Sequence, residues 1–555
     1  NEIQKASAAL VQMEFADANK QKLYDKLVAL GRKQAKAESS VPVVAPVPAD
    51  ANEETKLVHK IKTEEAKKQK AIVQQLDQDY QTLLAEWKEK YPGDAVIFES
   101  SARLDIPKIQ QALSEDQVLL HYMQLTDQLV IVCISRDSID SMIVNVSKKD
   151  IDNTIKTNFL VNYIELYGHN TAPTKEEDQQ YMQNAITTLS DLYTWLIKPI
   201  HNKIINKSRI YFSTGGFISQ VPFCALISSV ENNTPRFLVE DYEIGNIRSS
   251  FMAALTDINK KKSTKTLLAA GNPSNSKIKM KNLDSAEDEV ISVKNILGND
   301  DSVIDIKIKN EASEKWFKDK IYNSSYEYIY FATHGMPYSE VYYKYIIQYE
   351  SNLIKYKDKP KTLKRLKKEK AFIEKQLPSL SPLNSYLYFA DSDDSGYDGL
   401  FTIKEITQIP EKSFFNTRYV ILSACNTGVT FAPSTLEDNQ MIEFFSIKET
   451  ESQLRKAGWL PNVDQISFVD IFMRRNINNV YGTLWFADDK ASAYLLSYFM
   501  KILVSQGQEQ DAVAAFSKTQ RDFIANCKEG ENPLGLGYSY PLHPYFWAVG
   551  ALFGK

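Results

Sequence analysis

The fold is decided by the stretch Tyr419-Val-Ile-Leu-Ser-Ala-Cys425-Asn-Thr-Gly428. Its first half is a short run of apolar and β-branched residues, which is typical of a strand buried in a parallel sheet. Small residues follow, then a cysteine, then a turn that ends in glycine. The pattern therefore predicts that the thiol of Cys425 lies at the carboxyl end of a strand, the edge at which open α/β sheets bind their ligands.

A second stretch has the same design with an imidazole in place of the thiol: Glu327-Tyr-Ile-Tyr-Phe-Ala-Thr-His334-Gly335. A cysteine thiol is largely protonated at neutral pH, so it needs a neighbouring base to become a good nucleophile. Imidazole titrates near neutrality and can accept that proton, then pass it to a leaving amine. Taken singly, Cys425 would more often be a buried small residue and His334 a loop residue. Because both follow strands and precede glycine-containing turns, we predict a catalytic Cys/His dyad.

Gly335 follows the histidine directly. A glycine has no β-carbon, so a substrate backbone can pass close to it. We expect the backbone N–H groups of Gly335 and Cys425 to form an oxyanion hole, the set of donors that stabilises negative charge on the substrate carbonyl oxygen.

The two stretches resemble the catalytic motifs of the CHAT domain, a family of caspase-like cysteine peptidases related to separases. Further segments resemble parts of the family in the family's order: Ser213–Leu226, Phe237–Ile244, Leu267–Pro273, Asp398–Thr402, Val480–Asp489 and His543–Gly550. The resemblance covers roughly residues 95 to 555. It implies an α/β fold of mostly parallel sheets flanked by helices, with a degenerate lobe before a catalytic lobe, and a cysteine endopeptidase that cleaves a specific protein.

The resemblance also suggests a specificity residue. In separases an acidic residue just past the corresponding tryptophan strand helps to form a pocket for arginine, and Asp489 stands four positions after Trp485. This implies a basic residue before the scissile bond. The alternative is that Asp489 only caps the helix that begins there. The sequence departs from the family at Asn426, where an acidic residue is common, and at Asn476, where glycine is common.

The chain divides into three regions. We expect a helical region with a proline-rich linker, a non-catalytic caspase-like lobe, and a catalytic lobe with two inserts; in order these are 1–92 with the linker at 41–48, 93–262, and 263–555 with inserts at 337–382 and 429–462. The helical region is either the remnant of a helical-repeat array or a solvated stalk, and it shows no repeat of about 34 residues. Five segments are expected as further strands of the catalytic sheet: 302–308, 328–332, 385–390, 418–422 and 479–485.

Both inserts leave the edge that carries the predicted dyad. The first is rich in lysine and the second contains acidic clusters, so the two can close over the cleft against each other. We expect an activating protein partner to bind the inserts or the N-terminal helices and to open the cleft. The alternative is that both inserts are solvated surface segments. Direct binding of nucleic acid is not expected, because the net charge is −4.

Composition excludes several other functions. The four cysteines are far apart and form no CxxC pair, which argues against a disulfide framework and a zinc site: Cys133, Cys224, Cys425 and Cys527. No metal ligand cluster or phosphate-binding loop is present, so no cofactor is expected. No run of about 18 apolar residues suggests a membrane helix. We therefore expect a cytoplasmic protein, and a chain that begins at Asn1 without methionine is expected to be a fragment or a processed product.

Two other functions fit the same residues. One is a non-catalytic caspase-like interaction module in a signalling or defence complex, which would keep the fold without useful turnover. The other is a hydrolase that acts on a small thioester or amide. The intact pair of Cys425 and His334 favours the peptidase over the first, and an open groove at the sheet edge would favour it over the second.

Overall fold

A computed structural model describes the chain from Ala18 to Gly554, with gaps. The chain divides into two compact units. The first unit contains the described helices before residue 104, and the second contains the described residues from 106 onward. The linker at 41–48 and both inserts, apart from Lys364, lie outside the described residues. The segments that are not described are 40–52, 91–105, 126, 156–174, 215, 249–262, 277–279, 281, 299–302, 337–363, 365–384, 393, 395, 426, 429–466, 474, 476, 486, 508–509 and 536–540.

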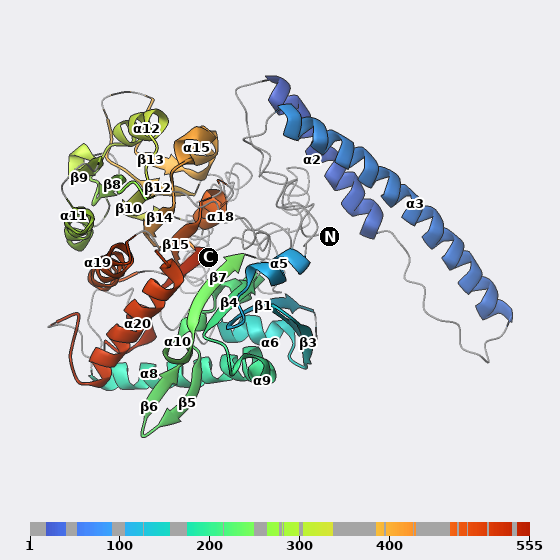
Figure 1. The fold of residues 1–555 in the computed structure, drawn as a ribbon, viewed down its shortest axis with the longest axis horizontal. Coiled ribbons are helices and arrows are strands. Elements are labelled where there is room, and N and C mark those ends of the chain that lie inside the picture. Colours follow the sequence, from blue (N-terminus) through green and yellow to red (C-terminus); the bar gives the residue numbers. More distant parts are fainter. Residues whose placement is uncertain are drawn as a thin grey trace. The chain divides into compact units, whose positions relative to one another are not determined.

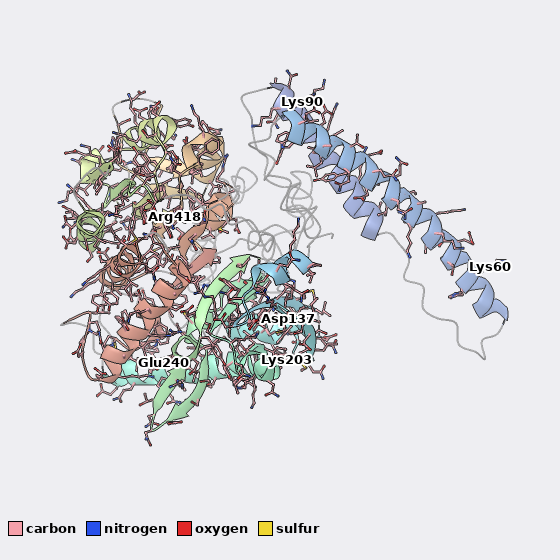
Figure 2. The ribbon with its side chains drawn as sticks, in the orientation of Figure 1. Lys60, Lys90, Asp137, Lys203, Glu240 and Arg418 are labelled. Atoms are coloured by element: carbon pink, nitrogen blue, oxygen red, sulfur yellow. The ribbon has the colours of Figure 1, made fainter. Side chains whose placement is uncertain are left out.

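The first unit contains an antiparallel pair of helices, α2 (Ala18–Ser39) and α3 (Glu53–Lys90). The start of α2 meets the end of α3, where the rings of Tyr24 and Trp87 are 6.1 Å apart and both side chains are buried. Toward the other end of α2, Gln69 donates a hydrogen bond to the carbonyl oxygen of Ala37. Lys60 and Lys90 on α3 mark two ends of this pair in Figure 2. No helix in the described parts of the chain is long and apolar enough to span a membrane.

The second unit is built on one sheet of eleven strands (Figure 1). In spatial order the strands are β3 (Ile139–Val144), β2 (Leu129–Ser135), β1 (Gln117–Gln124), β4 (Arg209–Thr214), β7 (Glu243–Arg248), β16 (Gly550–Gly554), β15 (Asn479–Thr483), β14 (Tyr419–Ser423), β10 (Tyr328–Ala332), β8 (Leu267–Gly271) and β9 (Ile304–Ile308). Among the strands that the structure describes in this sheet, only the pairs β3/β2, β2/β1 and β16/β15 are antiparallel. The mixed α/β fold with a mostly parallel sheet is the fold class that the sequence predicts.

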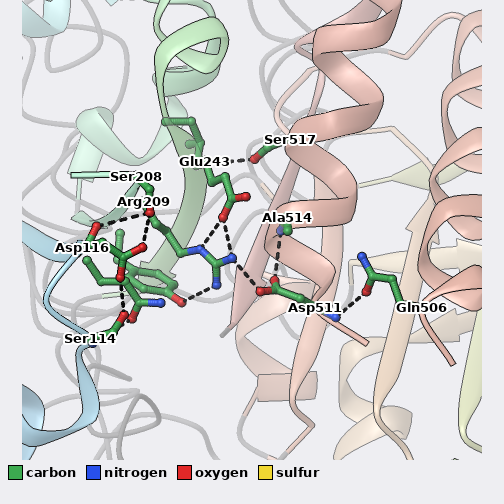
Figure 3. Close-up of polar contacts among 12 residues, drawn as sticks. Ser114, Asp116, Ser208, Arg209, Glu243, Gln506, Asp511, Ala514 and Ser517 are labelled. Carbon is green, nitrogen blue, oxygen red and sulfur yellow. Dashed lines mark hydrogen bonds and ion pairs between the residues drawn. The ribbon is translucent and has the colours of Figure 1, made fainter. Parts of the chain in front are cut away.

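The last strand of the chain joins two parts of this sheet. Strand β16 pairs with β15 on one side and with β7 on the other, so residues after 550 lie between strands that are far apart in the sequence. A polar cluster joins the neighbouring strands β4 and β7 to a C-terminal helix (Figure 3). Arg209 at the start of β4 binds Glu243 of β7 and also Asp511, which caps helix α20 (Ala512–Lys528). The cluster therefore ties a C-terminal helix to strands β4 and β7.

Helices cover both faces of the sheet around β10 and β14. Successive side chains of a strand point to opposite faces, and β10 shows this directly. Tyr330 hydrogen bonds to Glu289 of α11 (Asp284–Leu297). The ring of its neighbour Phe331 lies 4.9 Å from that of Phe317 in α12 (Glu314–Asn323) on the other face. Helix α19 (Asp489–Ser505) packs beside α11, and α18 (Phe468–Met473) carries Phe472, whose ring is 6.0 Å from Phe331.

One expected strand belongs elsewhere. The segment 385–390 was expected in the main sheet, but the strand within it, β12, lies in a separate antiparallel sheet of three strands, with β12 in the centre. Its members are β11 (Gly335–Met336), β12 (Tyr386–Tyr388) and β13 (Leu400–Thr402). The apolar run in this segment suits any buried strand, and periodicity does not say which sheet a short strand joins.

Candidate active site

Strands β10 and β14 bring the two predicted catalytic residues to the same place. The strands are parallel neighbours, and their last registered pair is Ala332 with Ser423. His334 and Cys425 each lie two residues beyond that pair, and 423 minus 332 and 425 minus 334 both give 91. The register continues beyond this pair, because the N–H of Thr333 is hydrogen bonded to the carbonyl oxygen of Ser423. Both side chains are half-buried at the carboxyl edge of the sheet.

The backbones of the two turns touch. Thr333 donates its N–H to the carbonyl oxygen of Ser423 at 3.1 Å, which continues the strand pairing by one residue. Next along the chain, a β-carbon added to Gly335 would stand 2.6 Å from the carbonyl oxygen of Cys425. Real β-carbons do not approach an oxygen this closely, so only glycine fits at this position. The N–H groups predicted for the oxyanion hole therefore belong to two turns in direct contact.

Two buried threonines hold the cysteine turn. Thr483, the last residue of β15, donates its hydroxyl to the carbonyl oxygen of Ala424 at 2.6 Å and accepts the N–H of Thr427 at 3.3 Å. Thr427 accepts the N–H of Thr483 in return, and Gly428 donates its N–H to the carbonyl oxygen of Thr483 at 2.8 Å. Both threonines are fully buried. This reciprocal pairing fixes the residues on both sides of Cys425 to a third strand.

The small sheet holds the histidine turn. Tyr388 of β12 donates its N–H to the carbonyl oxygen of His334 at 2.9 Å. Its ring stands edge-on to the imidazole, with the ring centroids 5.9 Å apart. Thr333 donates its hydroxyl to the carbonyl oxygen of Tyr388 at 2.6 Å. The histidine turn is thus hydrogen bonded to β14 through Thr333 and to β12 through His334, an arrangement that the sequence did not reveal.

Asp489 lies at the same edge, because α11 and α19 both begin where parallel strands end. Its carboxylate accepts the N–H of Ser285 in the first turn of α11 at 3.0 Å, and burial raises its pKa. The cap of its own helix is Asp488, which accepts the N–H of Ala491 at 2.8 Å. The alternative that Asp489 caps α19 is therefore wrong, because its side chain turns to the start of the neighbouring helix instead.

Glu289 was missed by the sequence reasoning. It lies beneath the strands that carry the dyad, with 1% of its surface exposed, and burial raises its pKa to about 8. The charge of Asp489 raises the pKa of Glu289 further. A signal was present, because Glu289 occupies a core position on the apolar stripe of an amphipathic helix.

Two other histidines of the described residues have partners outside the turns that carry His334 and Cys425. His121 pairs with Ser213 at 3.0 Å, and burial lowers its pKa. His201 contacts Tyr193. In the ranges that the structure describes, no group of three or more His, Cys, Asp or Glu side chains is arranged to hold a metal ion. Asn426 and Asn476, the two positions at which the sequence departs from the family, lie outside those ranges.

The sheet, the flanking helices and the paired turns define the class of caspase-like α/β proteins. The chain belongs to the CHAT domain family, a family of caspase-like cysteine peptidases, whose sequence model matches residues 187–555. A comparison with curated protein sequences found no relative.

Solved structures similar to the chain include separases and a gingipain. The chain is similar to separase in two crystal structures of the Saccharomyces cerevisiae separase–securin complex, with 7% and 8% sequence identity and TM-scores of 0.44 and 0.42. These alignments cover 98% and 96% of this chain but only 41% and 37% of the separase chains. It is also similar to the Arg-specific cysteine proteinase gingipain R, with 8% identity, a TM-score of 0.31, and coverage of 73% of this chain and 75% of that one.

Proposed function

We propose that the chain is a cysteine endopeptidase in which Cys425 is the nucleophile and His334 the general base and acid. The observation that carries the proposal is the shared register of the two turns, which puts both residues the same distance beyond neighbouring parallel strands. A thiol and an imidazole in such adjacent turns fit the geometry of nucleophilic catalysis. The family of the chain supports the same chemistry.

The proposed reaction follows from these groups. His334 accepts the proton of the Cys425 thiol, and the sulfur attacks the carbonyl carbon of the scissile peptide bond. The N–H groups of Gly335 and Cys425 stabilise the negative charge on the carbonyl oxygen. The C–N bond then breaks as His334 returns the proton to the leaving amine, and an acyl-enzyme thioester forms. Water, deprotonated by His334, hydrolyses the thioester and restores the thiol.

The substrate class rests on Asp489. We propose that this carboxylate lies in the pocket for the residue before the scissile bond and favours a basic side chain there. Its position at the carboxyl edge of the sheet supports this, as does its half-buried state, because burial strengthens the attraction between opposite charges. One carboxylate can accept several hydrogen bonds, so its bond to Ser285 leaves room for an arginine or a lysine.

The partner and the compartment belong to the proposal as well. We propose that an activating protein binds the helical pair α2 and α3 or the two inserts, and that the protein works in the cytoplasm. Long exposed helix faces on α2 and α3 suit a protein partner. None of the four cysteines, all of which lie in described segments, forms a disulfide, and this fits a reducing compartment.

The test is cleavage of a protein substrate. The full chain should be incubated with proteins encoded beside its own gene, and the new termini should be mapped by mass spectrometry. We expect a single cut site, which is lost in Cys425→Ala and in His334→Ala while the thermal unfolding of both variants stays close to wild type. The double variant should be about as inactive as either single variant, because residues that act as one unit fail together.

Two outcomes would contradict the proposal. Cleavage that persists in either single variant removes the dyad. Stable binding of a protein without any cut, by the wild type and by Cys425→Ala alike, indicates the interaction module instead.

A further inference from the structure

One carboxyl group interrupts the apolar face of α11. The residues of this helix that face the sheet or the neighbouring helix are spaced three or four apart, which is the spacing of a buried stripe. Four of them are apolar and one is a glutamate: Ala286, Glu289, Val290, Val293 and Leu297. Leucine or methionine would fill such a position without the cost of burying a carboxyl group. The glutamate therefore needs another reason to be there.

The carboxyl group of Glu289 links the two strands that carry the dyad. One oxygen accepts the hydroxyl of Tyr330 on β10 at 2.5 Å. The other accepts the hydroxyl of Ser423 on β14 at 3.2 Å. Tyr330 is four residues before His334, and Ser423 is two residues before Cys425. A single side chain of α11 thus contacts both strands, just before the turns that carry His334 and Cys425.

Ser423 passes this constraint to both turns. Its hydroxyl is bound to Glu289, and its carbonyl oxygen accepts the N–H of Thr333, the residue before His334. The peptide that follows Ser423 leads to Ala424, whose carbonyl oxygen is held by Thr483. Rotation or displacement of Ser423 would therefore move the histidine turn and the cysteine turn relative to each other.

The carboxyl group of Glu289 is expected to join Tyr330 and Ser423 in its neutral form. Burial raises the pKa of Glu289 to about 8, so the carboxyl group is mostly protonated at neutral pH. When the carboxyl group is protonated, one of its oxygens donates and the other accepts, so one of the two hydroxyls then accepts a hydrogen bond from Glu289 instead of donating one. A hydroxyl can do either, so both contacts are kept in the neutral state. Glutamine has the same shape and the same mixed hydrogen-bonding capacity, whereas leucine has neither donor nor acceptor.

We propose that Glu289 is a positioning residue, which sets the separation of Cys425 and His334 by fixing Ser423. The assignment rests on the proposed function, because it presupposes that the two residues act as a dyad. A polar residue placed against the local pattern of a core helix is expected where function, rather than stability, selects the residue.

The test measures the reactivity of Cys425 without a protein substrate. The rate of alkylation of Cys425 by iodoacetamide is followed by mass spectrometry in the full chain between about pH 5 and pH 9, the range in which thiols and imidazoles titrate. Three variants are compared with wild type: Glu289→Leu, Glu289→Gln and Ser423→Ala. We expect Glu289→Leu to slow the reaction at neutral pH by about tenfold or more, since small misplacements of catalytic groups are costly. Glu289→Gln should restore a rate close to wild type, and Ser423→Ala should slow it by less.

Glu327→Gln is the matched control. Glu327 is a fully buried glutamate at the opposite ends of the same two strands, where it binds Arg418 at 2.9 Å and the N–H groups of Thr264 and Lys265. Arg418 is labelled in Figure 2. We expect Glu327→Gln to lower the melting temperature and to leave the pH profile of Cys425 unchanged. A purely structural role for Glu289 would give the same result in Glu289→Leu.

The possible outcomes separate the positioning role of Glu289 from the catalytic pairing of Cys425 and His334. If Cys425 in wild type reacts fast and Glu289→Leu reacts equally fast, the positioning role is wrong and the dyad stands. If Glu289→Gln is as slow as Glu289→Leu, hydrogen bonding by a neutral group is not what Glu289 supplies, and the proposal is also wrong. If wild-type Cys425 reacts no faster than Cys527, the dyad itself fails, and the positioning role falls with it.

Discussion

The carbonyl oxygen of Cys425 lies 2.6 Å from the point at which a β-carbon on Gly335 would stand. The same point is 3.2 Å from the β-carbon of Ala424 and from the methyl group of Thr427. Three residues of the cysteine turn therefore lie in close contact with Gly335, the residue after His334. A substitution at Gly335 therefore acts on the spacing of His334 and Cys425, the proposed catalytic residues, without altering either side chain.

Gly335→Ala should abolish cleavage. The new methyl group meets a backbone oxygen, which cannot swing aside as a long side chain can, so one of the two turns must shift. A shift of about 1 Å costs an enzyme on the order of a hundredfold in rate. The measurement is cleavage of the mapped substrate, together with the melting temperature. Gly396→Ala is the control, because a β-carbon there meets only a carboxylate oxygen of Asp394, 3.7 Å away. Activity in Gly335→Ala that equals the control would show that the two turns need not touch.

Cys425 should be the first cysteine to react with iodoacetamide. Burial raises the pKa of Cys133 to about 11 and the pKa values of Cys224 and Cys527 to about 12, so these three are almost wholly protonated at neutral pH. The thiolate is the reactive form. Tryptic mapping after brief treatment at pH 7 gives the four rates, and His334→Ala should slow the reaction of Cys425 alone. Equal rates at all four cysteines would mean that Cys425 is not activated.

The sequence could predict where His334 and Cys425 lie, because each of them follows a strand signal; their catalytic role stays a prediction. Runs of apolar residues locate β10 and β14, and the residues after them are then placed by the general behaviour of parallel sheets. Paired residues of β10 and β14 are 91 positions apart, and so are His334 and Cys425. Only the structure shows that these two separations are equal. Periodicity specifies which segments are strands, but it does not specify which strands are neighbours.

The supporting residues were beyond such reasoning for a physical reason. Glu289, Thr483 and Tyr388 act through contacts with strands that are distant in sequence. Glu289 shows locally only as a polar residue on an apolar helix face, which does not reveal its partners, and nothing local distinguishes Thr483 or Tyr388 from an ordinary threonine or tyrosine. The small sheet shows the same limit, because β12 has the apolar run of a core strand yet pairs beside the histidine turn. Asp489 is the first residue of α19, but its side chain accepts the N–H of Ser285 in the first turn of α11, a contact that no local pattern shows.

Asp489→Ala should remove the preference for a basic residue before the scissile bond and should also destabilise the fold. The lost acceptor for Ser285 costs about 1 kcal/mol if it behaves as a helix cap. Profiling on a peptide library measures the preference, and chemical denaturation measures the stability. Asp488→Ala is the matched control, because it removes the cap of α19 at a similar cost while leaving Asp489 in place. A basic preference that survives in Asp489→Ala would leave this residue with a structural role only.

Glu289→Gln should gain stability relative to wild type as the pH rises. The pKa of Glu289 is about 8 in the folded chain and near 4.5 when unfolded, so between these values the native state holds a proton that the unfolded state has released. Stability therefore falls as pH rises through this window, by about 1.4 kcal/mol for each unit of pKa difference that is traversed. Glutamine has no proton to lose, so the variant lacks this slope. Thermal unfolding of both proteins at several pH values from about 5 to 8 gives the difference in melting temperature, in which the other titrating groups cancel. We expect the difference to be small at the acid end and to grow in favour of the variant towards pH 8. A difference that stays constant across the range would show that Glu289 is ionised in the folded protein, and a carboxylate would then be the species that holds Tyr330 and Ser423.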